Sequence, residues 1–160
     1  MLSMIFVIRE VIELKRLGFR IDVASINSPD RAPQDMTAVE RAESEHAYYV
    51  KAHGLAGALV AHFSTLLLRR ADYLRGWALV ARLGGGDLTR WARLLVYFTE
   101  ALMVGRWMGK RQLDHVHAHL GSQAATVGLF VKRVFKVRLD VLVASATFND
   151  VSVGARSCRL

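Results

Sequence analysis

Apolar and polar positions alternate with a period of two over His115–His119 and then change to helical spacing. Three histidines alternate with valine, alanine and leucine, so this segment is predicted to be a strand with all three imidazoles on one face. From 123 to 135 the apolar residues recur at helical spacing, which predicts a helix. Gly121 and Ser122 lie between the two, and Ser122 is a favourable N-cap residue. We therefore predict a strand, a tight turn and a helix, with His119 at the carboxyl end of the strand.

The same patterning predicts the other elements of the chain. We expect a helix over 3–17, strands over 19–26 and 138–143, a short acidic helix over 40–45, a short strand over 46–50, long apolar helices carrying basic residues over 55–83 and 88–110, and an irregular tail over 144–160. The glycine run 84–86 is expected to link the two long helices. Strands and helices that alternate in this way are typical of an α/β fold with a parallel sheet.

Neither long apolar helix is expected to cross a membrane. The segment 52–68 has no formal charge but contains histidines and glycines, and the second helix contains charged residues along its length, which are costly in a bilayer. On that second helix, helical angles place the polar residues on one narrow stripe, and nearly everything else is apolar. The stripe consists of Thr89, Arg93, Tyr97, Glu100 and Arg111. So broad an apolar surface is either buried or lies in a membrane interface.

Composition and charge narrow the classes of partner and the location. The chain has 160 residues, 52% of them hydrophobic, which is enough for a core of its own. One cysteine and no signal-peptide pattern predict a cytoplasmic protein without disulfides.

The net charge of +8 implies an acidic partner. Basic residues beside Trp77, Trp91 and Trp107 favour an anionic membrane surface at the inner face of the cell membrane over nucleic acid; the alternative is a basic, solvated face over an ordinary core.

The three histidines allow three interpretations. A His-x-His pair on a strand can bind a metal, but a metal site needs further ligands, and no histidine follows His119; the sequence therefore favours no metal. The histidines can also be hydrogen-bonded residues of a buried sheet. The third interpretation is contact with a ligand at the strand end, where open α/β sheets bind their ligands. Position favours this role for His119 and, less strongly, for His117.

The histidine segment resembles a known family. His115–His119 followed by Gly-Ser-Gln-Ala-Ala-Thr-Val-Gly resembles a segment in the N-terminal, acceptor-side domain of family 4 glycosyltransferases of the GT-B fold, of the exopolysaccharide and colanic-acid type. Residues 3–23 resemble the opening of the same enzymes, and the resemblance extends over about 3–139. It implies a two-domain enzyme of cell-surface polysaccharide synthesis. Such an enzyme moves a sugar from a nucleotide sugar to a lipid-linked or saccharide acceptor, without a metal or other cofactor.

The resemblance also implies roles for particular residues and a particular architecture. His119 and His117 would face the acceptor cleft, and Gly121 with Ser122 would form the turn beside it. The fold would be the N-terminal half of a GT-B enzyme: a Rossmann-like parallel sheet with flanking helices over 1–143, with a helical insertion at about 52–111.

The chain departs from the family pattern in specific places. The family has a strand before the first helix, a glutamate where Met4 stands, a histidine-aspartate motif where 144–147 lie, and a second domain that holds the nucleotide sugar. We therefore expect a fragment that transfers no sugar alone. Without the first strand, we expect the strands at 20–26 and 115–119 to lack a shared neighbour or to be forced together. The alternative is a non-enzymatic module that binds a membrane surface through basic amphipathic helices.

Overall fold

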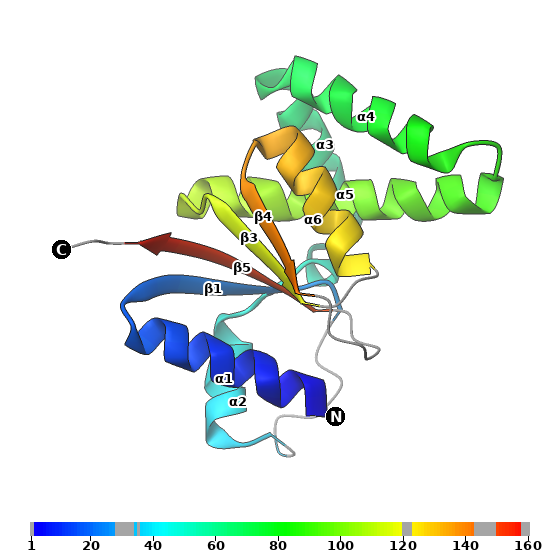
Figure 1. Cartoon of the computed structure of the whole chain (residues 1–160). Helices are drawn as coiled ribbons and strands as arrows, with labels where there is room; N and C mark the ends of the chain where they lie inside the picture. Colours follow the sequence, from blue (N-terminus) through cyan, green and yellow to red (C-terminus); the bar gives the residue numbers. More distant parts are fainter. Residues whose placement is uncertain (1, 28–33, 35, 120–122, 143–149, 158–160) are drawn as a thin grey trace.

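The fold is α/β, with helices on both faces of one sheet (Figure 1). The computed structural model describes residues 2–27, 34, 36–119, 123–142 and 150–157. The elements in chain order are α1 (Leu2–Arg16), β1 (Phe19–Ser25), α2 (Ala38–His46), β2 (Tyr48–Tyr49), the 3-10 turn η2 (Lys51–His53), α3 (Gly54–Leu68), α4 (Arg70–Gly84), α5 (Leu88–Arg111), β3 (His115–His119), α6 (Gln123–Phe135), β4 (Arg138–Leu142) and β5 (Asp150–Ser157).

The described strands form a sheet in the order β2-β1-β5-β3-β4. β1 pairs with β2 in parallel, and β3 pairs with β4 in parallel. β5 is antiparallel to both β1 and β3, so β1 and β3 point the same way. The parallel pairing of β3 with β4, in register from His115 and Arg138 to His119 and Leu142, confirms the predicted parallel arrangement of these two segments.

Two expectations about the middle of the sheet are wrong. β1 and β3 share a neighbour, because β5 lies between them. The segment 144–160, expected to be an irregular tail, contains this strand. The sequence from 151 to 156 alternates Val-Ser-Val-Gly-Ala-Arg, which suits a strand. The facing edges of β1 and β3 each present backbone groups that need partners, and β5 supplies them.

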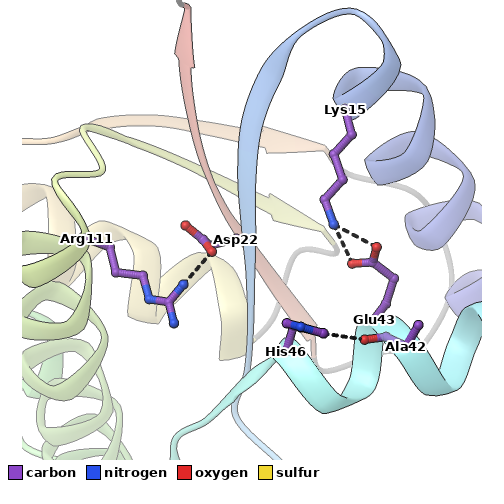
Figure 2. Close-up of polar contacts among 6 residues, drawn as sticks. All are labelled: Lys15, Asp22, Ala42, Glu43, His46 and Arg111. Carbon is purple, nitrogen blue, oxygen red and sulfur yellow. Dashed lines mark hydrogen bonds and ion pairs between the residues drawn. The ribbon is translucent and has the colours of Figure 1, made fainter.

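The first helix and its connection to β1 follow the prediction. α1 ends at Arg16, and Gly18 has φ +85°, a left-handed conformation that glycine adopts without steric cost. The acidic stretch forms α2, which begins with a capping box between Thr37 and Glu40. Lys15 joins the two helices through both carboxylate oxygens of Glu43, at 2.7 and 2.8 Å (Figure 2).

The expectation of two long apolar helices is wrong. The segment 55–83 is broken at Arg69, where φ is −140° and ψ 47°, into α3 and α4. Asp72 lies in the first turn of α4, where a negative charge is favourable, and the Arg69 guanidinium lies 5.4 Å from the centre of the Phe135 ring. α5 is long, but charged residues interrupt its apolar surface. Among the described residues, no helix combines the length and the apolar character needed to span a membrane.

The turn between α4 and α5 forms as predicted from its glycines. Gly85 has φ +55°, and the carboxylate of Asp87 caps α5 by accepting hydrogen bonds from the backbone N–H groups of Thr89 and Arg90, at 2.8 and 3.2 Å. At its other end, α5 is tied to β1 by an ion pair between Arg111 Nη1 and Asp22 Oδ1 at 2.7 Å (Figure 2).

The main core lies between α5, α6 and the face of β3 opposite the histidines. Val116 and Ala118 are fully buried on that face, as the alternation predicted. Phe98 of α5 meets Phe130 of α6 with ring centres 5.5 Å apart. α4 packs across α5 and α6, while α1 and α2 lie on the other side of the sheet (Figure 1).

Candidate functional site

The carboxyl ends of β1, β2, β3 and β4 meet at one edge of the sheet. All of them run in the same direction, and Figure 1 shows the strands converging near the first turn of α6. Chain segments that follow parallel strands are brought together at such an edge, which is where ligands of open α/β sheets bind. Polar residues come shortly after the strands here: Asn27 is the second residue after β1, and Lys51 is the second residue after β2.

Glu100 is the buried acid at this edge. Its side chain extends from the middle of α5, and only 5% of the residue is exposed. Gln123, the first residue of α6, donates from Nε2 to both oxygens of the carboxylate, at 3.0 and 3.3 Å. Burial raises the pKa of Glu100 above its ordinary value, and the hydrogen bond from Gln123 and the positive charge of Lys51 oppose this shift.

Lys51 connects the ends of the first two strands. Its ammonium group donates to the side-chain oxygen of Asn27. The backbone holds the same two segments together, because the N–H of Val50 donates to the carbonyl of Ser25 at 2.9 Å. Asn27 and Lys51 form one hydrogen-bonded pair, Glu100 and Gln123 form another, and the charge of Lys51 acts on Glu100. We call these four residues, which come from four separate elements or loops, the edge cluster.

An aromatic stack fixes the segment that carries Lys51. The Tyr48 ring lies against His53, with centres 4.8 Å apart, and against Trp107 of α5, with centres 5.0 Å apart. Burial raises the pKa of the Tyr48 hydroxyl, and the charge of Arg106 opposes this. Because two rings lie against Tyr48, the stack serves to hold the 48–53 segment on α5, two helical turns beyond Glu100.

Among the predicted site residues, His119 lies where it was expected, as the last residue of β3, with its backbone paired to Leu142. The His119 side chain, Gly121 and Ser122 lie outside what the structure describes. His117 lies within the strand, and its Nε2 is 3.6 Å from Glu10 Oε1 on α1. Ligand contact by His119 and His117 therefore stays a prediction.

His115 has an internal partner. Its Nε2 lies 2.9 Å from the carboxylate of Asp140 on β4. Within the described part of the chain, no three histidine, cysteine or acidic side chains lie close enough together to bind a metal ion.

The edge cluster was not predicted from the sequence. The helical pattern placed Glu100 on a polar stripe with Arg93 and Arg111, both of which are exposed, whereas Glu100 is buried. One signal was available: Glu100 is the only acidic residue between 88 and 111. A lone acid in an apolar helix is costly to bury without partners, so partners could have been sought.

Comparison with known proteins adds no family to these observations. No protein-family model matches the chain. No curated protein and no solved structure is similar enough to count as a match.

Proposed function

We propose that this chain is the acceptor-side domain of a GT-B glycosyltransferase of cell-surface polysaccharide synthesis, and that the edge cluster binds hydroxyl groups of its lipid-linked or saccharide acceptor. The donor would be a nucleotide sugar. The observation that carries the proposal is the convergence of Asn27, Lys51, Glu100 and Gln123 at the carboxyl edge of the parallel strands.

The order of the strands supports a Rossmann-like interpretation of the sheet. A doubly wound sheet has the order 3-2-1-4-5 and binds ligands at the carboxyl ends of its strands. Here β2 and β1 occupy the places of its third and second strands, and β3 and β4 occupy those of its fourth and fifth. β5 takes the central place in the opposite direction, which sets this sheet apart from that order.

The chemistry of the edge cluster suits a polyhydroxylated ligand. A sugar hydroxyl both donates and accepts hydrogen bonds. The cluster offers both functions, since ammonium and amide N–H groups donate while amide and carboxylate oxygens accept. Hydrogen bonds to charged groups contribute about 1.5–3 kcal/mol each. Lys51 is exposed whereas Glu100 is buried, so the ammonium group of Lys51 is expected to contribute most to acceptor affinity.

Binding of simple glycosides tests the proposal. Saturation-transfer NMR of the full chain with a panel of methyl glycosides is expected to detect at least one ligand. Lys51→Met is expected to weaken its affinity about tenfold or more, and His119→Ala is expected to weaken it too. Lys15→Met is the matched control, because Lys15 also pairs with one side chain but lies on α1, away from the edge. Absence of binding across the panel, or unchanged affinity in Lys51→Met, would contradict the proposal.

A transfer assay addresses the expectation that the 160 residues alone are inactive. Radiolabelled nucleotide sugars and a membrane extract are incubated with the purified chain and with a heat-killed sample. We expect equal label in the lipid fraction of both samples, because transfer needs donor and acceptor held together in one cleft. Label above the heat-killed level would overturn this expectation.

A further inference from the structure

α3 presents an apolar face to solvent. Large hydrophobic side chains on this helix are exposed, Leu59 by 62% and Phe63 by 66%. At about 100° per residue, the exposed set covers a continuous arc of about 140°. The arc consists of Leu55, Ala56, Leu59, Val60, Phe63, Leu66 and Leu67, and we call it the α3 apolar face.

The orientation of α3 is fixed by its opposite side. Ala61 and Thr65 are buried there. His62, at the border of the arc, places its ring between Tyr73 and Thr99, with Nδ1 and Nε2 each 3.0 Å from a hydroxyl oxygen. These contacts join α3 to α4 and α5, so the apolar face cannot turn inward without breaking them.

Positive charge borders the α3 apolar face. No acidic residue occurs from 54 to 71, and the exposed Arg69 and Arg70 follow the helix directly. The next two acids after the helix already have partners: Asp72 pairs with Arg75 and Lys136, and Asp87 caps α5. Exposed apolar side chains next to unbalanced basic ones are typical of a helix that binds an anionic lipid surface.

We propose that α3 docks, parallel to the membrane plane, on an anionic phospholipid surface, with Leu59 and Phe63 inserted among the lipid chains. With 15 residues, the helix is about 22 Å long, too short to cross a bilayer. A second copy of the chain is a poorer partner, since each copy carries a charge of +8. This docking is independent of the proposed acceptor site.

The tryptophans expected to mark a membrane interface are half-buried, and each has a contact within the protein. Trp77 packs edge-on against Phe98, and Trp107 stacks on Tyr48. The indole N–H of Trp91 donates to the carbonyl of Gly85 at 3.1 Å. Leucine, valine and phenylalanine of α3, rather than these tryptophans, form the proposed lipid-binding surface.

Vesicle co-sedimentation of the full chain tests the docking. The wild type is expected to bind vesicles of phosphatidylcholine with phosphatidylglycerol and to bind pure phosphatidylcholine vesicles more weakly. The double variant Leu59→Gln/Phe63→Gln is expected to lower the partition coefficient by about tenfold for each side chain. The matched control is Leu74→Gln/Leu88→Gln, which removes two leucines exposed by 62% and 84% on α4 and α5 and is expected to bind like the wild type.

Salt dependence, loss of vesicle binding and self-association each distinguish the proposal from its alternatives. Raising the salt from about 0.1 M to about 0.5 M should weaken binding without abolishing it, because the apolar contribution is not screened. Failure of the wild type to bind the anionic vesicles overturns the proposal. So does equal binding by the Leu59/Phe63 variant and the wild type, provided that circular dichroism shows both to be folded. A wild-type dimer in sedimentation equilibrium without lipid, lost in that variant, would assign the face to self-association instead.

Discussion

Gln123 donates from its side-chain amide to both carboxylate oxygens of Glu100, which joins the first turn of α6 to the middle of α5. The two residues are 23 positions apart in the sequence and meet because α5 and α6 pack against each other. This pair gives the buried carboxylate a partner at the edge where the parallel strands end. The protonation of Glu100 is therefore linked both to the candidate site and to stability.

Replacing Glu100 with glutamine should flatten the pH dependence of stability. Because burial raises the pKa of Glu100 in the folded state, the folded protein keeps a proton that the unfolded chain releases above the ordinary pKa of 4.5. The contribution of Glu100 to the free energy of unfolding therefore falls as pH rises from the ordinary pKa to the raised pKa of the folded state. Urea denaturation of wild type and Glu100→Gln at about pH 5 and pH 8 should show a smaller loss in the variant.

The control for this measurement is Glu13→Gln, since the Glu13 side chain is 64% exposed and pairs with Arg16 one turn away. This variant should keep the pH profile of the wild type. A Glu100→Gln profile that is parallel to that of the wild type would show that the carboxyl has no linkage to folding.

A methyl group at Gly105 should destabilise the contact between α5 and the end of α6. A Cβ at this position would lie 2.2 Å from the ring of Phe135, and overpacking of this kind costs about 1–3 kcal/mol. One turn further, a Cβ at Gly109 meets nothing within 4 Å. Gly109→Ala should instead stabilise the helix by about 0.5–1 kcal/mol. Chemical denaturation of the two variants should give changes of opposite sign, and equal changes would contradict the packing described here.

Acid should weaken the packing of α3 through His62. Burial lowers the pKa of this histidine, so below its ordinary value of 6.5 the unfolded chain binds a proton that the folded protein does not. Its contribution to stability is therefore present above that pH and lost as the pH falls. His62→Gln should cost about 1 kcal/mol at pH 8, from the loss of one of two hydrogen bonds. The difference from wild type should shrink by about pH 5.5, and a constant difference would contradict this.

Asp72 should stabilise the protein at neutral pH by joining α4 to the residue after α6. Its carboxylate lies 3.2 Å from the ammonium of Lys136 and 2.7 Å from the guanidinium of Arg75. The hydrogen bond from Lys136, then that from Arg75, lowers its pKa, and partial burial opposes this. Asp72→Asn should cost about 1 kcal/mol at pH 7, since both cations are more than half exposed.

The sign of the pH effect at Asp72 is opposite to that at Glu100. A lowered pKa gives stability that is present above the ordinary value of 3.8 and is lost as pH falls through the folded-state value. Acid denaturation of wild type and Asp72→Asn should therefore converge at low pH. A double-mutant cycle with Lys136→Met measures the coupling, and a coupling energy of zero would contradict the ion pair.

Features decided by neighbouring residues were predictable from the sequence. The strand His115–His119 and the helix 123–135 are found with the predicted bounds, because a change of period from two to 3.6 is a local property. The end of α1 before Gly18 and the turn at Gly85 follow from glycine in left-handed conformations. The α/β class follows from the order of these elements.

Features that depend on contacts between distant segments were not predictable in this way. The burial of Glu100 depends on α6 and on the 48–53 segment. The break at Arg69 depends on the packing of α4 across α5 and α6. The position of β5 depends on β1 and β3, two strands that are far from it in the sequence. A helical pattern shows that a side chain lies on a given face, but which neighbour covers that face depends on the whole chain. The sequence by itself thus determined the strand 115–119, the helix 123–135 and the glycine turns. Only the tertiary structure decided which polar residues meet at the sheet edge and which apolar face stays exposed on α3, because burial is a property of packed surfaces.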